Sequence, residues 1–245
     1  MDFRGIKAHV KRHYERLYRG ETRCAAPVER GKALAKALGY SADLLEAVGE
    51  EDWELFVPCG NPLPFVPQRS GGRILHLGCG LGVDALAMAW KTEGRPAAMF
   101  NMDVDAGILG RGKGLASSLL PDFPGMFWIC ADGDHLPLRG ESLEGVVMNG
   151  VFNLFPRKDS LLGEIRRVLK PGGRLTGVDL CRTVSLPDYF LREPDAWAWC
   201  MNGACREEEL KELLEENGLR FARVARLEEG EWFHRVAFQG EKPPG

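Results

Sequence analysis

Short apolar runs alternate along most of the chain with longer segments in which apolar residues recur at helical spacing. The apolar runs predict strands at 73–77, 97–103, 126–131, 143–148 and 174–180. The segments between them predict helices at 83–90, 106–119 and 158–170. Since two parallel strands need a crossover that is usually a helix, this order predicts a parallel sheet covered by helices on both faces.

The last third of the chain adds a different pattern. After an irregular stretch at 183–205, the sequence predicts a helix at 207–216. It then predicts strands at 221–227 and 232–238, and the Glu228-Glu-Gly-Glu231 segment between them is typical of a β-hairpin. The predicted fold class is therefore α/β, with a seven-stranded, mostly parallel sheet that ends in a C-terminal antiparallel hairpin.

The first 70 residues differ from the rest of the chain. They predict helices at 2–19, 27–38 and 42–48, followed by a loop at 57–67 that is rich in proline and glycine. We therefore divide the chain into an N-terminal helical cap at 1–70 and a core domain at 71–245, whose stretch 181–205 is expected to contribute to a substrate site. Ligands of open α/β sheets bind at the carboxyl ends of the strands, so we expect the cap to close over that edge.

Composition and charge exclude several classes of function. Hydrophobic residues make up 44% and charged residues 27% of the chain, which is typical of a globular protein. The net charge of −3 argues against a nucleic-acid partner, and the lack of an apolar run of about 18 residues argues against a membrane span. The seven cysteines, none in a Cys-x-x-Cys spacing, suit a reducing compartment. We therefore expect a cytoplasmic protein without a structural metal site.

A glycine-rich turn joins the first strand of the core domain to the next helix. It reads Leu77-Gly78-Cys79-Gly80-Leu81-Gly82, and glycines at such a place allow a ligand to approach the backbone at a helix N-terminus. The spacing G-x-G-x-G differs from the G-x-G-x-x-G of dinucleotide sites, which favours a ligand without phosphates. Taken alone, the turn is explained equally well by plain turn geometry.

Acidic residues follow the next two strands. Asp103 ends the second strand, where a carboxylate can accept hydrogen bonds from both hydroxyls of a ribose, although Asp103 or Asp105 can instead cap the following helix. Asp132 follows the third strand, in Ala131-Asp-Gly-Asp-His-Leu-Pro-Leu138. There its side chain can receive an adenine amino group or simply shape a turn. We identify no catalytic base in the sequence.

Four motifs in this order resemble those of class I S-adenosylmethionine-dependent methyltransferases. They are the glycine turn, Asp103, the acidic loop around Asp132, and Arg166-Arg-Val-Leu-Lys-Pro-Gly-Gly-Arg-Leu175. The resemblance implies the Rossmann-like fold of that class, S-adenosylmethionine as cofactor, and methyl transfer to a small-molecule acceptor. It implies that the cofactor is bound by Tyr14, Gly78, Cys79, Gly80, Gly82, Asp84, Asp103, Val104, Asp132, Gly133 and Asn149.

One position departs from the pattern of that class. Its members usually carry Asp or Glu two residues before the first glycine, where the carboxylate orients the glycine turn and the methionine ammonium. This chain has His76 there. Asp84, at the start of the following helix, is a candidate to compensate. Tyr14 is expected to cover the methyl group, or else to pack its helix against the core.

Within the class, the chain is similar to arsenite methyltransferases. The matching segments are His13-Tyr14, Cys24, Cys59-Gly-Asn-Pro62, Asp84, Asn149-Gly-Val-Phe-Asn-Leu154 and Trp199-Cys-Met-Asn-Gly-Ala204. Trivalent arsenic is thiophilic, so the resemblance implies Cys24, Cys59 and Cys200 as its ligands if their loops converge. The cysteine that the family carries after the fourth strand is Gly150 here.

Every cysteine also has a simpler interpretation as a small buried hydrophobic residue. We interpret Cys79, Cys130 and Cys181, which lie at predicted strand ends, as packing residues of this kind.

Three functions stay open at this point. The first is a methyltransferase for a small molecule of unassigned identity, and the second is a methyltransferase for arsenite or another thiophilic metalloid. The third is a catalytically inactive module that binds S-adenosylmethionine, with His76 and Gly150 as marks of lost activity. A nucleotide-dependent dehydrogenase is disfavoured by the glycine spacing.

Overall fold

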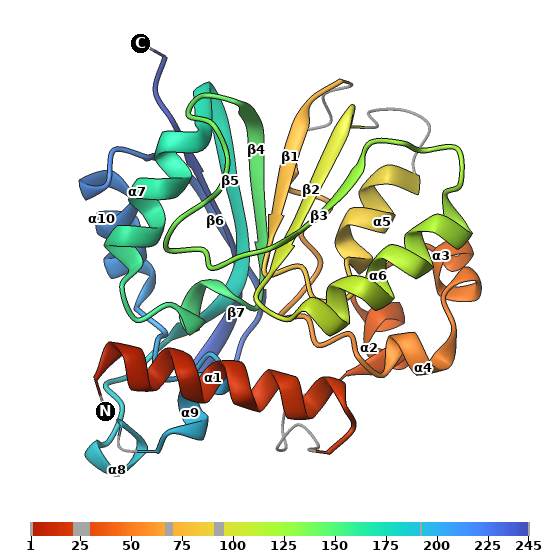
Figure 1. The fold of residues 1–245 in the computed structure, drawn as a ribbon. Coiled ribbons are helices and arrows are strands. Elements are labelled where there is room, and N and C mark those ends of the chain that lie inside the picture. The colour runs from red at the N-terminus through yellow and green to blue at the C-terminus, as the bar shows by residue number, and fades with distance from the viewer. Residues whose placement is uncertain (1, 22–29, 67–70, 91–95, 192, 245) are drawn as a thin grey trace.

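A seven-stranded sheet with the strand order β3-β2-β1-β4-β5-β7-β6 runs through the centre of the computed structural model, which describes residues 2–21, 30–66, 71–90, 96–191 and 193–244 (Figure 1). Its strands are β1 (Arg73–Leu77), β2 (Ala98–Asp103), β3 (Met126–Cys130), β4 (Leu143–Asn149), β5 (Leu169–Arg182), β6 (Arg220–Glu228) and β7 (Phe233–Glu241). Strands β1 to β5 are parallel, and β7 pairs antiparallel with both β5 and β6. The predicted Rossmann-like sheet with a C-terminal antiparallel hairpin is confirmed.

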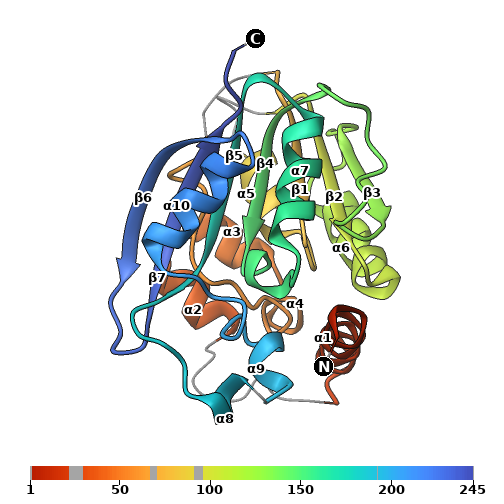
Figure 2. The same cartoon turned by 90° about the vertical axis from the view of Figure 1, so that its left-hand side faces the viewer.

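Alternate residues of the central strands face two different cores. The helices of the core domain are α5 (Val83–Trp90), α6 (Ala106–Leu119), α7 (Lys158–Val168) and α10 (Glu207–Glu216). Leu75 of β1 and Met148 of β4 pack with α7 and α10, which lie together on one side of the sheet in Figure 2. Ile74 and Val147 pack with α5 on the other side. Because side chains of a strand alternate between faces, both faces of the sheet are buried, as predicted.

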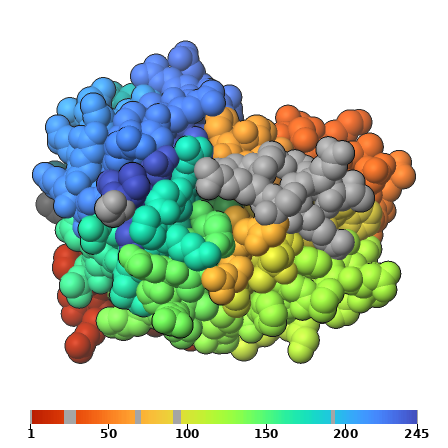
Figure 3. Space-filling model, turned by 90° about the horizontal axis from the view of Figure 1, so that it is seen from above, coloured from red at the N-terminus to blue at the C-terminus, as the bar shows by residue number. Residues whose placement is uncertain are grey.

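The N-terminal helices divide into two groups. They are α1 (Phe3–Tyr18), α2 (Gly31–Ala37), α3 (Ala42–Ala47) and α4 (Glu50–Trp53). Helix α1, which Asp2 caps by accepting a 2.7 Å hydrogen bond from the N–H of Gly5, lies across the carboxyl ends of the parallel strands (Figure 1). Helices α2 to α4 pack beside α5 and α6 around the fully buried Trp53. Figure 3 shows the opposite end of the molecule, where α1 is visible only at the margin.

Several elements differ from the predicted boundaries. Helix α7 ends at Val168, two residues early, because Leu169 already pairs with Leu143 of β4, so that β5 includes the Pro171-Gly-Gly173 turn. The stretch at 183–205, predicted as irregular, contains two short helices, α8 (Asp188–Leu191) and α9 (Asp195–Ala198). In addition, a short 3-10 helix, η1 (Phe152–Leu154), follows β4. None of the described helices is both long and apolar enough to cross a bilayer.

Candidate functional site

The glycine-rich turn after β1 has a backbone that other residues adopt only with strain. Gly78, Gly80 and Gly82 have φ angles of +66°, +50° and +82°. At Gly78 a Cβ atom would lie 2.4 Å from a methyl carbon of Val151, so space as well as backbone conformation requires glycine there. The N–H of Gly78 donates a 2.8 Å hydrogen bond to the carbonyl of Met102, which holds the turn against the end of β2.

Asp103 lies at the end of β2 and faces this turn. Its carboxylate accepts hydrogen bonds from the N–H groups of Gly80, at 2.9 Å, and Asp105, at 3.1 Å. Burial raises the pKa of Asp103, although these hydrogen bonds act in the opposite direction. Asp105 in turn caps α6 by accepting a 2.9 Å hydrogen bond from the N–H of Ile108. The helix-cap role that the sequence allowed for either aspartate therefore belongs to Asp105.

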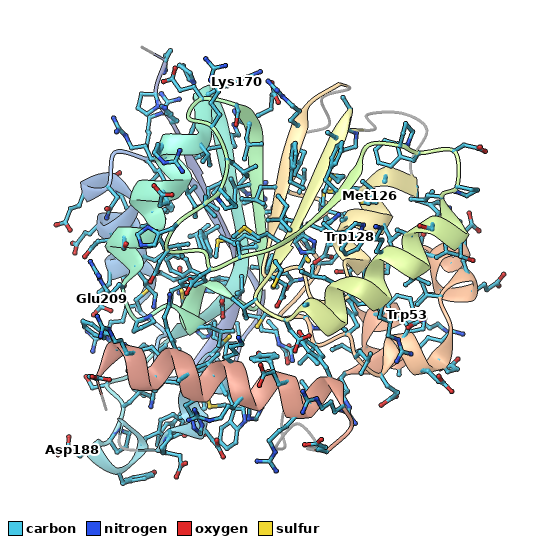
Figure 4. All side chains as sticks on the ribbon, in the orientation of Figure 1. Trp53, Met126, Trp128, Lys170, Asp188 and Glu209 are labelled. Carbon is cyan, nitrogen blue, oxygen red and sulfur yellow. The ribbon has the colours of Figure 1, made fainter. Side chains whose placement is uncertain are left out.

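A cavity of about 260 Å³ opens between the glycine turn, the carboxyl ends of the strands and α1. Ten of the eleven residues that the sequence assigned to the cofactor line it, namely Tyr14, Gly78, Cys79, Gly80, Asp84, Asp103, Val104, Asp132, Gly133 and Asn149. Gly82 does not: a Cβ atom there would lie 2.6 Å from the indole of Trp128, which comes from β3 and is labelled in Figure 4. The structure thus brings ten of the eleven predicted residues together around one cavity. Their roles in binding a cofactor stay predictions.

A buried carboxylate forms part of the cavity wall. Asp84, only 1% exposed, accepts hydrogen bonds from the hydroxyl of Tyr40, at 2.5 Å, and from the side-chain amide of Asn149, at 3.0 Å. Burial and the charge of Asp84 raise the pKa of Tyr40, so its hydroxyl keeps the proton that it donates. The Nε2 atom of His76 lies 3.5 Å from the same carboxylate. Asp84 thus stands beside the histidine that replaces the usual acidic residue of the class.

Helix α1 is tied to the opposite wall by ion pairs. The ammonium group of Lys7 lies 2.7 Å from Asp132 and 2.5 Å from Asp134, and the imidazole of His9 lies 2.8 Å from Asp195 of α9. Burial raises the pKa of Asp132, but hydrogen bonds from the N–H of Asp134 and from Lys7 outweigh it, so this pKa lies below its ordinary value. The carboxylate that the sequence assigned to adenine is therefore held by the helix that covers the cavity.

A second cavity, of about 300 Å³, adjoins the first. Both are lined by Tyr14, Val57, Pro58 and Gly150. Cys59, Cys200 and the hairpin residues 228–233 line only the second cavity. One cavity is thus formed around the glycine turn and the other around two thiols, an arrangement that suits a reaction between two substrates.

Three potential ligand groups converge at the second cavity. The sulfurs of Cys59 and Cys200 lie within 4.8 Å of each other and of a carboxylate oxygen of Asp179, which is buried behind the cavity wall near the end of β5. The Cys59 sulfur is 3.8 Å from this carboxylate, and the Cys200 thiol donates a 3.2 Å hydrogen bond to the carbonyl of Gly150. Cys200 has a φ angle of +62°, and strained backbone of this kind clusters at functional sites.

The environment of Asp179 and Cys200 favours their protonated forms. Asp179 is 1% exposed and accepts hydrogen bonds from the backbone N–H groups of Asn153, at 3.0 Å, and Leu180, at 2.8 Å. Burial nevertheless raises the pKa of Asp179. A hydrogen bond with Cys59, together with burial, raises the pKa of Cys200 well above its ordinary value. The Cys200 thiol therefore keeps its proton at neutral pH.

The sequence predicted only part of this thiol site. Of the three predicted cysteines, the structure brings together Cys59 and Cys200, and Cys24 lies outside the described residues. Asp179 was not predicted. Its place at the carboxyl end of a parallel strand is the signal that could have found it, because ligands of such sheets bind there.

Residues 68–218 match the family described as a methyltransferase domain. An arsenite methyltransferase of Halobacterium salinarum is 30% identical over 199 residues, which cover 81% of this chain and 50% of that protein. The chain spans about half the length of the first curated relatives it matches.

Two solved structures share the fold. An arsenic(III) S-adenosylmethionine methyltransferase from Chlamydomonas reinhardtii has a TM-score of 0.67 at 24% identity, over 87% of this chain and 74% of that one. Phosphoethanolamine N-methyltransferase 2 of Haemonchus contortus, in complex with S-adenosyl-L-methionine, has a TM-score of 0.60 at 16% identity, over 74% of this chain and 50% of that one. The chain therefore belongs to the methyltransferase domain family and has the fold of class I S-adenosylmethionine-dependent methyltransferases.

Proposed function

We propose that this chain transfers the methyl group of S-adenosylmethionine to a trivalent, thiophilic acceptor such as arsenite, which Cys59 and Cys200 hold. The observation that carries the proposal is the convergence of these two thiols, beside the buried carboxylate of Asp179, in the cavity that adjoins the one at the glycine turn. Relatives described as arsenite methyltransferases support it. The proposal selects a metalloid among the small-molecule acceptors that the sequence left open.

The first cavity has groups that fit the parts of S-adenosylmethionine. The carboxylate of Asp103, which the N–H groups of Gly80 and Asp105 hold in place, is the group that can accept hydrogen bonds from the ribose hydroxyls. The buried carboxylate of Asp84 offers a negative charge to the methionine ammonium, and the glycine turn lets the ligand approach the backbone. When bound, the cofactor supplies a methyl group on an activated sulfonium. The protein has to place a nucleophile beside it and exclude water.

The second cavity has groups that fit arsenite. Each binding thiol replaces one hydroxyl: a sulfur–arsenic bond forms, an arsenic–oxygen bond breaks, and the hydroxyl leaves as water with the thiol proton. Asp179 faces both thiols, and because burial favours its protonated form, it can carry the proton between thiol and hydroxyl. Two such exchanges leave arsenic with its lone pair and one hydroxyl. A soft nucleophile of this kind needs no general base for attack on the methyl group.

The proposal is tested with the full chain, S-adenosylmethionine and arsenite in the presence of a reducing thiol. We expect methylated arsenic products, measured by chromatography coupled to mass spectrometry, and their loss in Cys59→Ser and Cys200→Ser. Cys130→Ser is the matched control, because Cys130 is exposed on β3 and lines neither cavity. Calorimetry should show that the two loss variants still bind S-adenosylmethionine.

The outcomes separate the three functions that the sequence left open. If the protein binds S-adenosylmethionine and methylates an organic acceptor from a panel but not arsenite, the metalloid proposal is overturned. The hypothesis of a methyltransferase for another small molecule then remains. Binding without methylation of any acceptor in that panel would favour an inactive module. Failure to bind S-adenosylmethionine would contradict the assignment of the first cavity.

A further inference from the structure

A second pair of thiols lies beside the first. Cys181 is two residues after Asp179 on β5, so both side chains point to the same face of the sheet. Cys205 follows α9 and is five residues beyond Cys200. The thiols of Cys181 and Cys205 lie close enough together that each acts on the pKa of the other. Neither residue belongs to the segments that resemble arsenite methyltransferases, and the place of Cys181 at a predicted strand end indicates only a packing residue.

Backbone contacts hold this second pair in place. The N–H of Arg182 donates a 3.0 Å hydrogen bond to the carbonyl of Cys205, and the Arg182 guanidinium donates a 3.1 Å hydrogen bond to the carbonyl of Ala204. The same guanidinium forms an ion pair of 2.8 Å with Glu209 of α10. The segment that carries Cys205 is therefore fixed against the end of β5. The two thiols are held together before any ligand arrives, which lowers the entropic cost of binding one ligand through both.

Both cysteines pack in the core formed by α7 and α10, but they differ in exposure. Cys181 is 2% exposed, whereas Cys205 is only partly buried. The ammonium group of Lys158, at the start of α7, donates a 3.2 Å hydrogen bond to the carbonyl of Phe155, and its charge acts on Cys205. The hydrogen bond with Cys181 and the charge of Lys158 lower the pKa of Cys205, although burial opposes them. Because Cys205 is the more exposed of the two residues, it is the one that a ligand meets first.

We propose that Cys181 and Cys205 form a second binding site, separate from Cys59 and Cys200, for a trivalent arsenical that is bound by two thiols. For an arsenical of the form R–As=O, two sulfur–arsenic bonds form and the arsenic–oxygen bond breaks. The oxygen leaves as water with the two thiol protons. The product is neutral, so the ammonium of Lys158 beside the pair does not oppose its formation. The site does not depend on methyl transfer.

The experiment uses phenylarsine oxide, whose carbon substituent leaves arsenic two positions for thiols. Intact mass spectrometry under native conditions counts the adducts on the full chain carrying Cys24→Ser, Cys59→Ser and Cys200→Ser, which removes the acceptor thiols. We expect one adduct, which survives an excess of a monothiol and is removed by a small dithiol, as chelation requires. The further substitution Cys205→Ser should abolish this adduct. Cys130→Ser in its place should leave it intact.

Two results would overturn the proposal. One is the lack of any adduct on the triple variant while that variant still binds S-adenosylmethionine. The other is an adduct that persists after Cys205→Ser.

Should the triple variant fail to fold, alkylation of Cys205 in the unsubstituted chain provides the same test. We expect iodoacetamide to label Cys205, and phenylarsine oxide to block that labelling, as measured by peptide mapping. Labelling that phenylarsine oxide leaves unchanged would overturn the proposal. Because both readouts concern binding alone, the second site can be shown even if arsenite is never methylated, and the two proposals fail independently.

Discussion

A Cβ atom on Gly150 would lie 3.2 Å from the sulfur of Cys59. Gly150 has a φ angle of +68°, and its carbonyl accepts the hydrogen bond of the Cys200 thiol. At the position where the resemblance to arsenite methyltransferases implies a cysteine, this chain therefore has no side chain. The backbone of Gly150 lies there between the thiols of Cys59 and Cys200. Asp179 supplies the third potential ligand group of the cluster.

We expect Gly150→Ala to weaken both stability and arsenite binding. The left-handed backbone costs a non-glycine residue about 1–2 kcal/mol, and the added methyl group presses on Cys59. In a chain of this size each kcal/mol lowers the melting temperature by about 2–4 °C, which calorimetry can follow. Gly163→Ala is the control: it lies inside α7 with no neighbouring atom within 4 Å, so alanine there should not destabilise the protein. Equal melting temperatures for Gly150→Ala and the unsubstituted protein would contradict this account.

We expect Asp103→Asn to weaken binding of S-adenosylmethionine. Hydrogen bonds to a charged acceptor contribute about 1.5–3 kcal/mol each, so the loss of the charge should raise the dissociation constant by roughly tenfold to a hundredfold. Titration calorimetry measures the change. Asp105→Asn is the matched control, because asparagine also caps helices and Asp105 holds α6 by such a cap. If both variants bind equally well, Asp103 does not contact the ribose.

The fold could be predicted from the sequence because it depends on local patterns. The apolar run of β1 and the glycines after it specify a strand and a turn without reference to the rest of the chain. The thiol site could be predicted only in part, because its contacts join distant segments: Cys59 and Asp179 are 120 positions apart. Lys7 and Asp132 are 125 positions apart, and neither pattern nor spacing indicates that they meet. Cys205 lies in a segment with no regular pattern, and only its contact with Cys181 distinguishes it.

The docking of α1 should depend on pH through Asp132. In the folded protein the pKa of Asp132 lies below its ordinary value. The ionised carboxylate therefore stabilises the docked helix fully at any pH above the ordinary pKa, and this stabilisation is lost as the pH falls through the lowered pKa. We expect hydrogen exchange of the α1 amides to accelerate on acidification. Lys7→Met removes the ammonium that pairs with Asp132, and exchange in α1 should then be faster already at neutral pH. Lys11→Met is the control. Lys11 lies on the same helix, and its ammonium is 3.9 Å from Glu15 of α1 itself, so this ion pair does not join α1 to the core domain. The substitution should leave exchange unchanged.

The buried carboxylate of Asp84 should matter for the cofactor through its charge, and a rescue experiment can separate charge from structure. We expect Asp84→Asn to weaken binding of S-adenosylmethionine by about tenfold or more, because the methionine ammonium loses its only proposed carboxylate partner. His76 lies 3.5 Å from Asp84, so His76→Asp places a carboxylate next to the same part of the cavity. As a single change it brings two buried carboxylates together and should destabilise the protein, since like charges raise each other's cost of ionisation.

In the double variant, His76→Asp with Asp84→Asn, one carboxylate is again present, at the position where the class usually carries it. Calorimetry should then show binding of S-adenosylmethionine closer to that of the unsubstituted protein than to that of Asp84→Asn alone. Tyr40→Phe is the structural control: it removes the 2.5 Å hydrogen bond to Asp84 but keeps the charge, and should lower the melting temperature more than it lowers affinity. An affinity in the double variant no better than that of Asp84→Asn would show that Asp84 acts by holding Tyr40 and Asn149 in place and not by its charge.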